Sequence, residues 1–457
     1  MEKNQSRDLI FSNNADTITA IATPPGVGGV GIIRISGPKA KAISGLLTKK
    51  TAVHQNAIYS AFLDSNDEQL DFGYLLYFKS PHSFTGEDVV EVQCHGGPVV
   101  IDLILQRILQ LGARLAEAGE FSKQAFLNDK IDLVQAEAIA DLIESSSVAS
   151  VKLAQRALKG DFSKAVNSLA ANIIKLRMYV EASLDFPEEE IDFISDGNVL
   201  QKLEDLFAEL KAILAKATQG AMVREGLQIV IIGKPNAGKS TIINQLSGQE
   251  TAIVTSIAGT TRDILREKIL INDIPIHVVD TAGLRDSTDE IEQEGIRRAK
   301  NAALSADLIL LVVEHQNSSE LEINKFIENE GITGPLLIAI NKIDQASIKP
   351  NIIDNKVFIS AKDGEGMKLL KSKILEMAGV NQKEAQGSYL ARRRHLNALE
   401  KALDSLTTGL NNLKSFHAGE LLAEDLKQAH QSLCEITGEF SADDLLGEIF
   451  SSFCIGK

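Results

Sequence analysis

The spacing of apolar residues divides the chain into stretches of different texture. The first stretch, to about residue 128, mixes short β-branched runs and glycine-rich loops with one helix-like segment at 99–111, which predicts an α+β domain. From 129 to about 221, apolar residues recur at helical spacing among Ala, Leu, Lys and Glu, which predicts long amphipathic helices. The strands expected in the first stretch are 18–22, 31–35 and 89–93.

A third pattern runs from about 227 to 380. Near-continuous apolar runs, typical of strands buried on both faces of a parallel sheet, alternate there with helical stretches. Residues 268–279 form a hairpin pattern around the polar pair Asn272-Asp273, which predicts one antiparallel strand. Helical spacing returns after 382, so we expect an α/β domain inserted into a helical domain whose two segments pack as one bundle. The expected parallel strands are 229–232, 276–279, 308–313, 336–340 and 357–359.

Composition narrows the class of protein. A chain of 457 residues predicts two or three domains, and 44% hydrophobic with 24% charged residues is typical of a soluble globular protein. The net charge of −15 argues against indiscriminate binding to polyanions or anionic membranes. Three cysteines without a Cys-x-x-Cys pair favour a reduced cytosolic setting over a zinc site or a disulfide framework. The polar start carries no apolar region of the kind found in signal peptides, so we expect none, and no apolar run is long enough to span a bilayer.

A phosphate-binding loop follows the first strand of the α/β stretch. Gly233-Lys234-Pro235-Asn236-Ala237-Gly238-Lys239-Ser240 lies between the strand 229–232 and a helical pattern from Thr241. In that context loop amides and a helix N-terminus bind phosphate oxygens, the lysine reaches the β- and γ-phosphates, and the serine binds Mg²⁺. The alternative, a glycine-rich turn with a chance lysine, does not account for this context.

Further motifs specify guanine. Asp280-Thr281-Ala282-Gly283 can hold Mg²⁺ through water and contact the γ-phosphate. Asn341-Lys342-Ile343-Asp344 places a carboxylate where N1 and the 2-amino group of guanine can donate to it, and adenine lacks that amino group. Ser360-Ala361-Lys362 can contact guanine O6 through a backbone amide. Together and in this order the motifs resemble translation-factor-type P-loop GTPases.

The residues that orient the attacking water are less clear. Within Gly259-Thr260-Thr261-Arg262-Asp263, Thr261 is the candidate switch threonine, and the alternative is a polar connecting loop. Leu284 stands where Ras-like GTPases carry a glutamine and cannot orient water. Three acidic residues downstream could do so, although from spacing alone a solvated acidic helix start is the better explanation for any one of them. These candidates are Glu290, Glu292 and Glu294.

A basic run, Arg392-Arg393-Arg394-His395, stands out in this acidic chain. It could contact the phosphates of a nucleic acid. A solvated helix face is the alternative, which we favour from the sequence.

Over nearly its whole length the chain resembles the MnmE (TrmE) family of tRNA-modification GTPases. The motifs that carry the resemblance are Ala22-Thr23-Pro24-Pro25-Gly26, Ser83-Phe84-Thr85-Gly86-Glu87-Asp88, His95-Gly96-Gly97-Pro98, Ala125-Phe126-Leu127-Asn128-Asp129-Lys130, Leu184-Asp185-Phe186-Pro187-Glu188, the nucleotide motifs above, and Phe453-Cys454-Ile455-Gly456-Lys457. The resemblance implies an N-terminal domain at 1–128, a helical domain at 129–221 and 382–457, and a GTPase domain at 222–381.

The resemblance also implies a K⁺ ion in place of an arginine finger. Its ligands would be Asn236, Thr255, Ile257 and Thr260, Mg²⁺ would be bound by Ser240 and Thr261, and Glu292 would orient water, with Lys239 on the phosphates. The full GTP-binding set would be Asn236, Ala237, Gly238, Lys239, Ser240, Thr241, Thr255, Ser256, Ile257, Ala258, Gly259, Thr260, Thr261, Asp280, Thr281, Ala282, Gly283, Asn341, Lys342, Asp344, Ser360, Ala361 and Lys362.

The family further implies a tetrahydrofolate site in the N-terminal domain, binding a 5-formyl or 5,10-methylene derivative. Its residues would be Arg34, Glu87, Lys130 and Lys457, which without the resemblance would be taken for surface charges. Val27 stands where relatives often carry a polar or basic residue. Cys454 would lie near the tRNA uridine or the folate, and we hypothesise that it acts as a nucleophile.

The function implied by the resemblance is K⁺-dependent GTP hydrolysis that drives installation of an aminomethyl or carboxymethylaminomethyl group at C5 of the wobble uridine in certain tRNAs. The protein would be a cytoplasmic homodimer that forms a heterotetramer with MnmG, a protein that uses FAD. The alternative is an Era- or Der-like switch in ribosome assembly, which docks on rRNA without covalent chemistry. Such proteins usually carry a basic RNA-binding appendage, and the acidic balance here argues against it.

Overall fold

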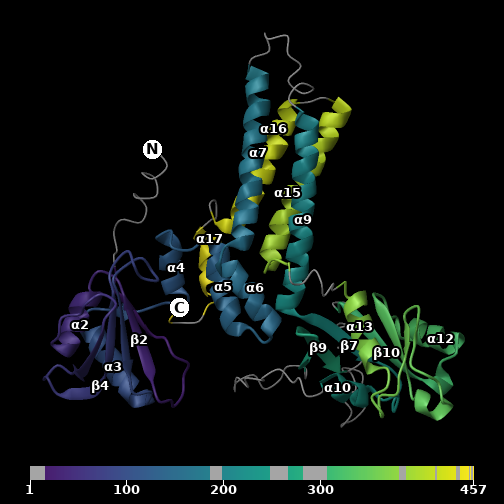
Figure 1. Ribbon diagram of the computed structural model, residues 1–457, viewed down its shortest axis with the longest axis horizontal. Coiled ribbons are helices and arrows are strands. Elements are labelled where there is room, and N and C mark those ends of the chain that lie inside the picture. Colours follow the sequence, from purple (N-terminus) through teal and green to yellow (C-terminus); the bar gives the residue numbers. More distant parts are fainter. Residues whose placement is uncertain are drawn as a thin grey trace. The chain divides into compact units, whose positions relative to one another are not determined.

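The computed structural model describes residues 16–185, 198–247, 266–280, 306–379, 387–416, 419–438, 443–451, 453 and 456. The chain divides into two compact units (Figure 1). Unit 1 comprises Met1–Ala140 and Thr437–Lys457, and unit 2 comprises Asp141–Ile436. Each unit is described by itself below.

Unit 1 is built on a six-stranded mixed sheet with the order β3-β4-β5-β2-β1-β6. Alternate residues of β2 point to opposite faces, so Ile33 and Ile35 enter the core formed with two helices while Arg34 projects to the other side. The strands are β1 (Ile18–Ile21), β2 (Gly31–Ser36), β3 (Ala57–Leu63), β4 (Gln69–Phe78), β5 (Val89–Cys94) and β6 (Arg114–Leu115), and the two helices are α2 (Ala40–Thr48) and α3 (Pro98–Gln110). The expected strands and helix of this region are confirmed.

Strands β3 and β4 were not expected from the sequence. Exposed aromatic residues on these strands, Tyr59, Phe72 and Tyr74, break the simple alternation of buried apolar and exposed polar positions. Gly73, a residue type that is disfavoured within strands, lies inside β4 and further obscures the pattern; it is required there because any side chain would collide with the carbonyl of Gln93 on β5.

The C-terminal end of the chain belongs to the core of unit 1. Helix α17 (Asp443–Ser451) packs against α4 (Glu120–Leu127) and the first part of α5 (Leu133–Glu144). Leu133 and Ala136 of α5 share one apolar cluster with Ile449 and Phe450 of α17 and with Phe453. Phe453, which follows α17, is therefore anchored in the unit that contains the N-terminal sheet.

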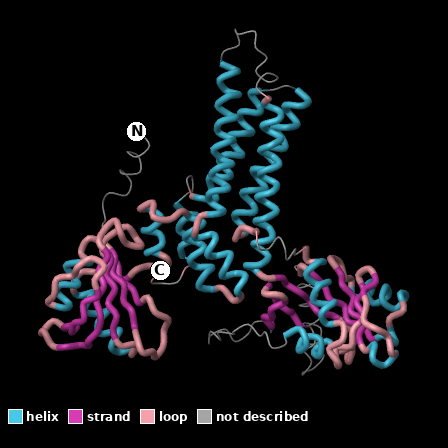
Figure 2. Tube along the Cα trace, viewed as in Figure 1, coloured by secondary structure: helices cyan, strands magenta, loops and turns pink. Residues whose placement is uncertain are grey.

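Long helices form much of unit 2 (Figure 2). They are α6 (Val148–Leu158), α7 (Asp161–Asp185), α9 (Val199–Glu225), α15 (Arg393–Phe416) and α16 (Gly419–Thr437). Helix α9, which precedes the α/β part, packs against both α7 and α15, and α15 follows the α/β part. Among the described helices, none combines the length and the apolar content needed to cross a bilayer. The prediction of a GTPase-like α/β part inserted between packed helices is confirmed.

The α/β part of unit 2 has a seven-stranded sheet with the order β12-β13-β11-β10-β7-β9-β8. Four neighbouring pairs are parallel, and β8 pairs with β9 as the predicted antiparallel hairpin, with Asn272 and Asp273 at φ of 52° and 64° in its turn. The strands are β7 (Leu227–Ile232), β8 (Arg266–Ile271), β9 (Ile274–Asp280), β10 (Leu308–Glu314), β11 (Leu336–Asn341), β12 (Ile352–Ile353) and β13 (Lys356–Phe358). Its helices are α10 (Lys239–Ser247), α12 (Glu320–Glu330) and α13 (Met367–Met377).

Candidate functional site

The phosphate loop connects the parallel strand β7 to helix α10, as the sequence predicts. Asn236 and Gly238 have φ of 62° and 97°, so the loop curls back before α10 begins at Lys239. The ammonium group of Lys239 donates to the carbonyls of Gly233 and Lys234 at 2.8 and 2.9 Å. The positive charge of Lys239 is thereby held inside the loop, at the N-terminus of a helix, where a phosphate would bind.

Two glycines of the loop have no room for a side chain. A Cβ on Gly233 would collide with the carbonyl of Val312 on β10, and a Cβ on Gly238 would collide with the amide of Asn341. Glycine is needed at both positions because the loop lies directly against the backbone of Val312 at one and the side-chain amide of Asn341 at the other. The loop therefore has the close-packed backbone that a phosphate cradle requires.

Asn341, at the end of β11, links the phosphate loop to the guanine-binding motifs. Asn341 is 3% exposed, and its side chain donates to the carbonyl of Ala237 at 2.9 Å and accepts from the amide of Ala361 at 3.0 Å. One buried amide thus fixes the distance between the loop for the phosphates and the loop for the base. This link is the geometric basis for assigning both loops to one ligand.

The carboxylate that would select guanine is positioned by a neighbouring hydroxyl. Ser360 donates towards Asp344 at 3.0 Å and Asp363 at 2.8 Å, and a single hydroxyl proton serves one of the two at a time. Lys342 adopts a φ of 67°, and its ammonium pairs with Glu314 at 2.6 Å. Sequence reasoning missed Asp363 and Glu314, although Glu314 directly follows the strand predicted at 308–313 and is the last residue of the observed β10.

Part of the predicted nucleotide site lies outside the described residues. Asp280 ends β9, which is parallel to β7 with Asp280 opposite Ile231, so it reaches the same edge of the sheet as the phosphate loop. Ser240, Thr241 and Lys362 are exposed near this edge. The predicted site residues outside the described ranges are Thr255, Ser256, Ile257, Ala258, Gly259, Thr260, Thr261, Thr281, Ala282, Gly283, Leu284, Glu290, Glu292, Glu294, Cys454 and Lys457.

A second cluster of charged residues lies in unit 1, on the side of β2 opposite its helix-covered core. Arg34 pairs with Glu91 through Nε at 3.0 Å and Nη2 at 2.8 Å, and its guanidinium lies 5.8 Å from the ring centre of Phe84 and 5.7 Å from that of Phe121. Its Nη1 donates to the carbonyl of Gly456 at 3.4 Å. The predicted proximity of Arg34 to the C-terminal residues is therefore present in the described part of the tail.

Glu87 belongs to the same side of β2. The hydroxyl of Ser36, two residues along β2 from Arg34, donates to Glu87 at 2.7 Å. Burial raises the pKa of Glu87, the nearby charge of Glu120 raises it further, and the bond from Ser36 opposes both. The aliphatic part of Lys130 packs over Gly86, and its ammonium donates to the carbonyl of Pro81 at 2.9 Å. Sequence reasoning missed Ser36 and Glu91, whose residue types carry no motif of their own.

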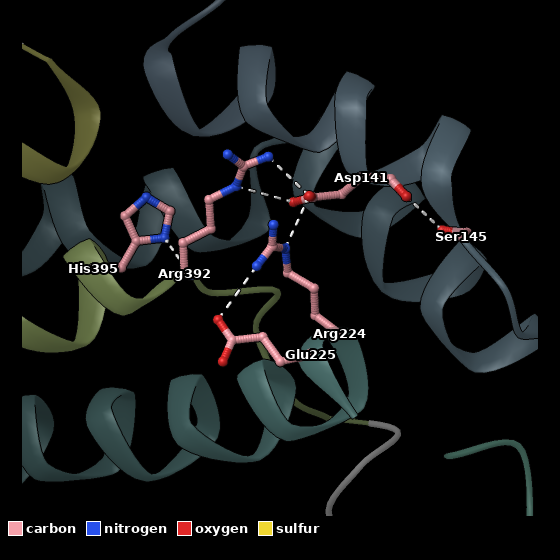
Figure 3. A network of polar contacts seen from close by, with 6 residues as sticks. All are labelled: Asp141, Ser145, Arg224, Glu225, Arg392 and His395. Atoms are coloured by element: carbon pink, nitrogen blue, oxygen red, sulfur yellow. Dashed lines mark hydrogen bonds and ion pairs between the residues drawn. The ribbon is translucent and has the colours of Figure 1, made fainter. Parts of the chain in front are cut away.

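The basic run that starts at Arg392 does not form a solvated face, contrary to the favoured interpretation. Arg392 pairs with the buried carboxylate of Asp141 (Figure 3), and Arg394 donates to the carbonyls of Glu435 and Ile436 at 3.0 and 3.1 Å. Arg393 is the exposed arginine of this run. Internal contacts therefore occupy the two flanking arginines, which weakens the case for a tRNA-binding patch here.

Family models and known proteins match the chain over most of its length. Residues 17–130 match the family model described as GTP-binding protein TrmE N-terminus, and residues 133–454 match the MnmE helical domain. Similar curated proteins are named tRNA modification GTPase MnmE. That of Legionella pneumophila (strain Paris) is 56% identical over 97% of this chain and 99% of its own length, and that of Hydrogenovibrio crunogenus is 53% identical over 98% and 100%.

Among solved structures, the FeoB G-domain from Methanococcus jannaschii is 26% identical, covering 34% of this chain and 97% of that chain with a TM-score of 0.24. The family models and the full-length relatives span both the nucleotide motifs and the flanking regions described above. The chain belongs to the MnmE family of tRNA modification GTPases.

Proposed function

We propose that this protein hydrolyses GTP to drive modification of C5 of the wobble uridine in certain tRNAs, installing an aminomethyl or carboxymethylaminomethyl group. The observation that carries the GTP-binding part is Asn341, whose buried side chain joins the phosphate loop to the guanine-binding loop. Membership of the MnmE family supports tRNA as the substrate and favours modification over the Era- or Der-like alternative.

The residues of this chain divide the work of phosphoryl transfer. Lys239, the first residue of α10, would release the carbonyls of the phosphate loop and bind the β- and γ-phosphates. Ser240, Thr261 and Asp280 would hold Mg²⁺, which when bound offsets the negative charge of the phosphates. Asp344, positioned by Ser360, would accept from guanine. Glu292 would orient the water that attacks the γ-phosphate.

A K⁺ ion would supply the positive charge that other GTPases obtain from an arginine. Asn236 has an exposed side chain in the phosphate loop, which suits a cation ligand, and Thr255, Ile257 and Thr260 would complete the shell. GTP turnover should therefore be faster in KCl than in NaCl at equal ionic strength, and equal rates would contradict the proposal.

Glu292→Ala should bind GTP normally yet hydrolyse it slowly, because the variant lacks the carboxylate proposed to orient the attacking water. Turnover at the wild-type rate would assign that role to Glu290, Glu294 or another group instead.

The cluster around Arg34 is proposed as the site for a tetrahydrofolate one-carbon donor. Arg34 and Lys130, with Lys457, suit the carboxylates of folate, and Glu87 suits the donor groups of the pterin. Binding of 5-formyl-tetrahydrofolate to the full chain, measured by calorimetry, should weaken in Arg34→Gln. The exposed Lys49, which pairs with Asp67 in the same unit, offers the control Lys49→Gln. Equal affinity in all three proteins, or none in the wild type, would contradict this assignment.

The remaining assignments concern organisation and partners. We propose domains at 1–128, 129–221 with 382–457, and 222–381, in a cytoplasmic homodimer that forms a heterotetramer with FAD-dependent MnmG. The proposed boundary at 128 differs from the boundary between the two compact units, because α5 begins in unit 1 and ends in unit 2.

A further inference from the structure

The inserted α/β part joins the helices of unit 2 through two chain crossings that touch each other. The first crossing is the end of α9, which leads into β7, and the second is the segment 387–392, which leads into α15. The amide of Tyr389 donates to the carbonyl of Lys216 on α9 at 3.2 Å. Gly220 on α9 has no room for a side chain because the carbonyl of Tyr389 presses against it. The two crossings are therefore packed together where the α/β part begins and ends.

One buried carboxylate binds both crossings (Figure 3). Asp141, in the last turn of α5, has a side chain that is 5% exposed, and its Oδ1 accepts from Nε of Arg224 and from Nη2 of Arg392, both at 2.8 Å. The second carboxylate oxygen lies 3.5 Å from Nε of Arg392. Arg224 stands in the last turn of α9, and Arg392 immediately precedes α15. We call these three residues the Asp141 clamp.

Stability alone is a weak explanation for the Asp141 clamp. Burying a carboxylate with two guanidinium groups carries a large desolvation cost, and apolar side chains of similar size often hold a fold equally well. Ion pairs of this kind are directional, unlike apolar contacts, because the planar guanidinium fixes where its partner lies. The arrangement therefore suits a joint whose orientation matters.

The first crossing also contacts β9, the strand that ends at the proposed nucleotide site. The carbonyl of Glu225, next to Arg224, lies 3.0 Å from Nε2 of His277 on β9. Gly226 then turns the chain with a φ of 75°, pressed against the backbone of β9. Strand β9 ends at Asp280, the first residue of the motif expected at Mg²⁺ and the γ-phosphate. A displacement of β9 would thus move Glu225 and Gly226, which are next to Arg224 of the Asp141 clamp.

Helix α5 connects the Asp141 clamp to the core of unit 1. The same helix that ends with the Asp141 clamp begins with Leu133 and Ala136, which pack against α17 in the core of unit 1. The chain after α17 leads to Cys454 and Lys457, and Gly456 accepts from Arg34. We infer that Asp141 is a positioning residue: it holds both ends of the GTPase part to α5, so that a nucleotide-dependent shift of β9 reaches the chemistry of unit 1. This inference rests on the proposed function.

The first test measures transmission without tRNA. Arg224→Gln and Arg392→Gln each cut one side of the Asp141 clamp and leave the buried Asp141 with one arginine. Glu225→Gln is the matched control. The side chain of Glu225 is 50% exposed and lies 3.3 Å from Arg224, so the substitution removes an ion-pair partner of Arg224 and leaves Asp141 untouched. Hydrogen exchange of residues 133–144 in the full chain should change on adding a non-hydrolysable GTP analogue in the wild type and Glu225→Gln, and should not change in either cut variant. The same response in all four proteins, or none in the wild type, would overturn the inference.

The second test distinguishes an effect on GTP hydrolysis from an effect on tRNA modification. In cells that carry each variant in place of the wild type, modified wobble uridine should fall at least about fivefold for the cut variants, the lower end of typical coupling between sites. GTP turnover and nucleotide affinity of the purified proteins should stay within about twofold of wild type, since the phosphate loop is intact. Parallel loss of turnover and modification would overturn the inference by making the Asp141 clamp a support of the GTPase fold.

Controls keep the two proposals apart. If Arg392→Gln does not fold, Arg392→Lys keeps the charge but loses the planar two-donor contact, and it carries the same expectation. Absence of wobble modification in cells that contain the wild-type protein would contradict the proposed function, whereas the exchange response of α5 would still decide the role of Asp141.

Discussion

Asn341 offers the sharpest test of how the nucleotide site is assembled. In Asn341→Ala the carbonyl of Ala237 and the amide of Ala361 lose the partner that joins them. A typical intramolecular hydrogen bond contributes about 0.5–1.5 kcal/mol net, so the two bonds together contribute about 1–3 kcal/mol. If this cost falls on binding, because the two loops must then be ordered by the ligand, GDP affinity should fall about 5- to 160-fold.

Titration of a fluorescent GDP analogue against the purified full chain measures this loss. Asn355→Ala is the matched control, because Asn355 makes a comparable bond of 3.1 Å to the carbonyl of Leu336 in the same sheet but contacts neither nucleotide loop. The control should lose some thermal stability and keep its affinity for GDP. Affinity of Asn341→Ala within twofold of wild type, with unchanged melting temperature, would refute the claim that this side chain holds the two loops in register.

Three further expectations follow from single residues. Because burial raises the pKa of Glu87, ionising this carboxyl destabilises the folded state as the pH rises above the ordinary value of 4.5. The melting temperature of Glu87→Gln should therefore rise relative to that of the wild type as the pH is raised from acid to neutral. A difference in melting temperature that does not change with pH would contradict the claim that Glu87 ionises in a buried site. Burial raises the pKa of Cys94 to about 11, so Cys94 should resist alkylation in the native protein at about pH 8; mass spectrometry then shows whether Cys454 accounts for the reactive thiol. Asp344→Asn should weaken GTP binding at least about 100-fold and favour xanthosine triphosphate, whose 2-oxo group can accept from the new amide; unchanged base preference in nucleotide titrations would remove Asp344 from the base site.

The parts of the fold that the sequence predicts are those with one dominant constraint. The strands of the α/β part are buried on both faces, so their apolar runs are continuous and mark them directly. The phosphate loop is recognisable because glycine is sterically required at Gly233 and Gly238. Strands β3 and β4 escaped prediction because exposed aromatic residues and Gly73 obscure their alternation.

Long-range pairing is what the sequence does not show. Asp141, Arg224 and Arg392 are far apart along the chain, and nothing in their local sequence indicates that one carboxylate binds both arginines. The run at Arg392 looks like a surface patch because charge density is visible in a sequence and burial is not. The pairing of Arg34 with Glu91 depends in the same way on the register of β2 and β5, where these residues lie opposite each other.

The central claim, that GTP binding by this chain serves modification of the wobble uridine, is tested most directly by nucleoside analysis of tRNA. Cells that lack the protein should lose the C5-modified wobble uridine, the wild-type chain should restore it, and Lys239→Ala, which removes the phosphate-binding ammonium group, should not. Unchanged modification in the cells that lack the protein, or full restoration by Lys239→Ala, would contradict the account.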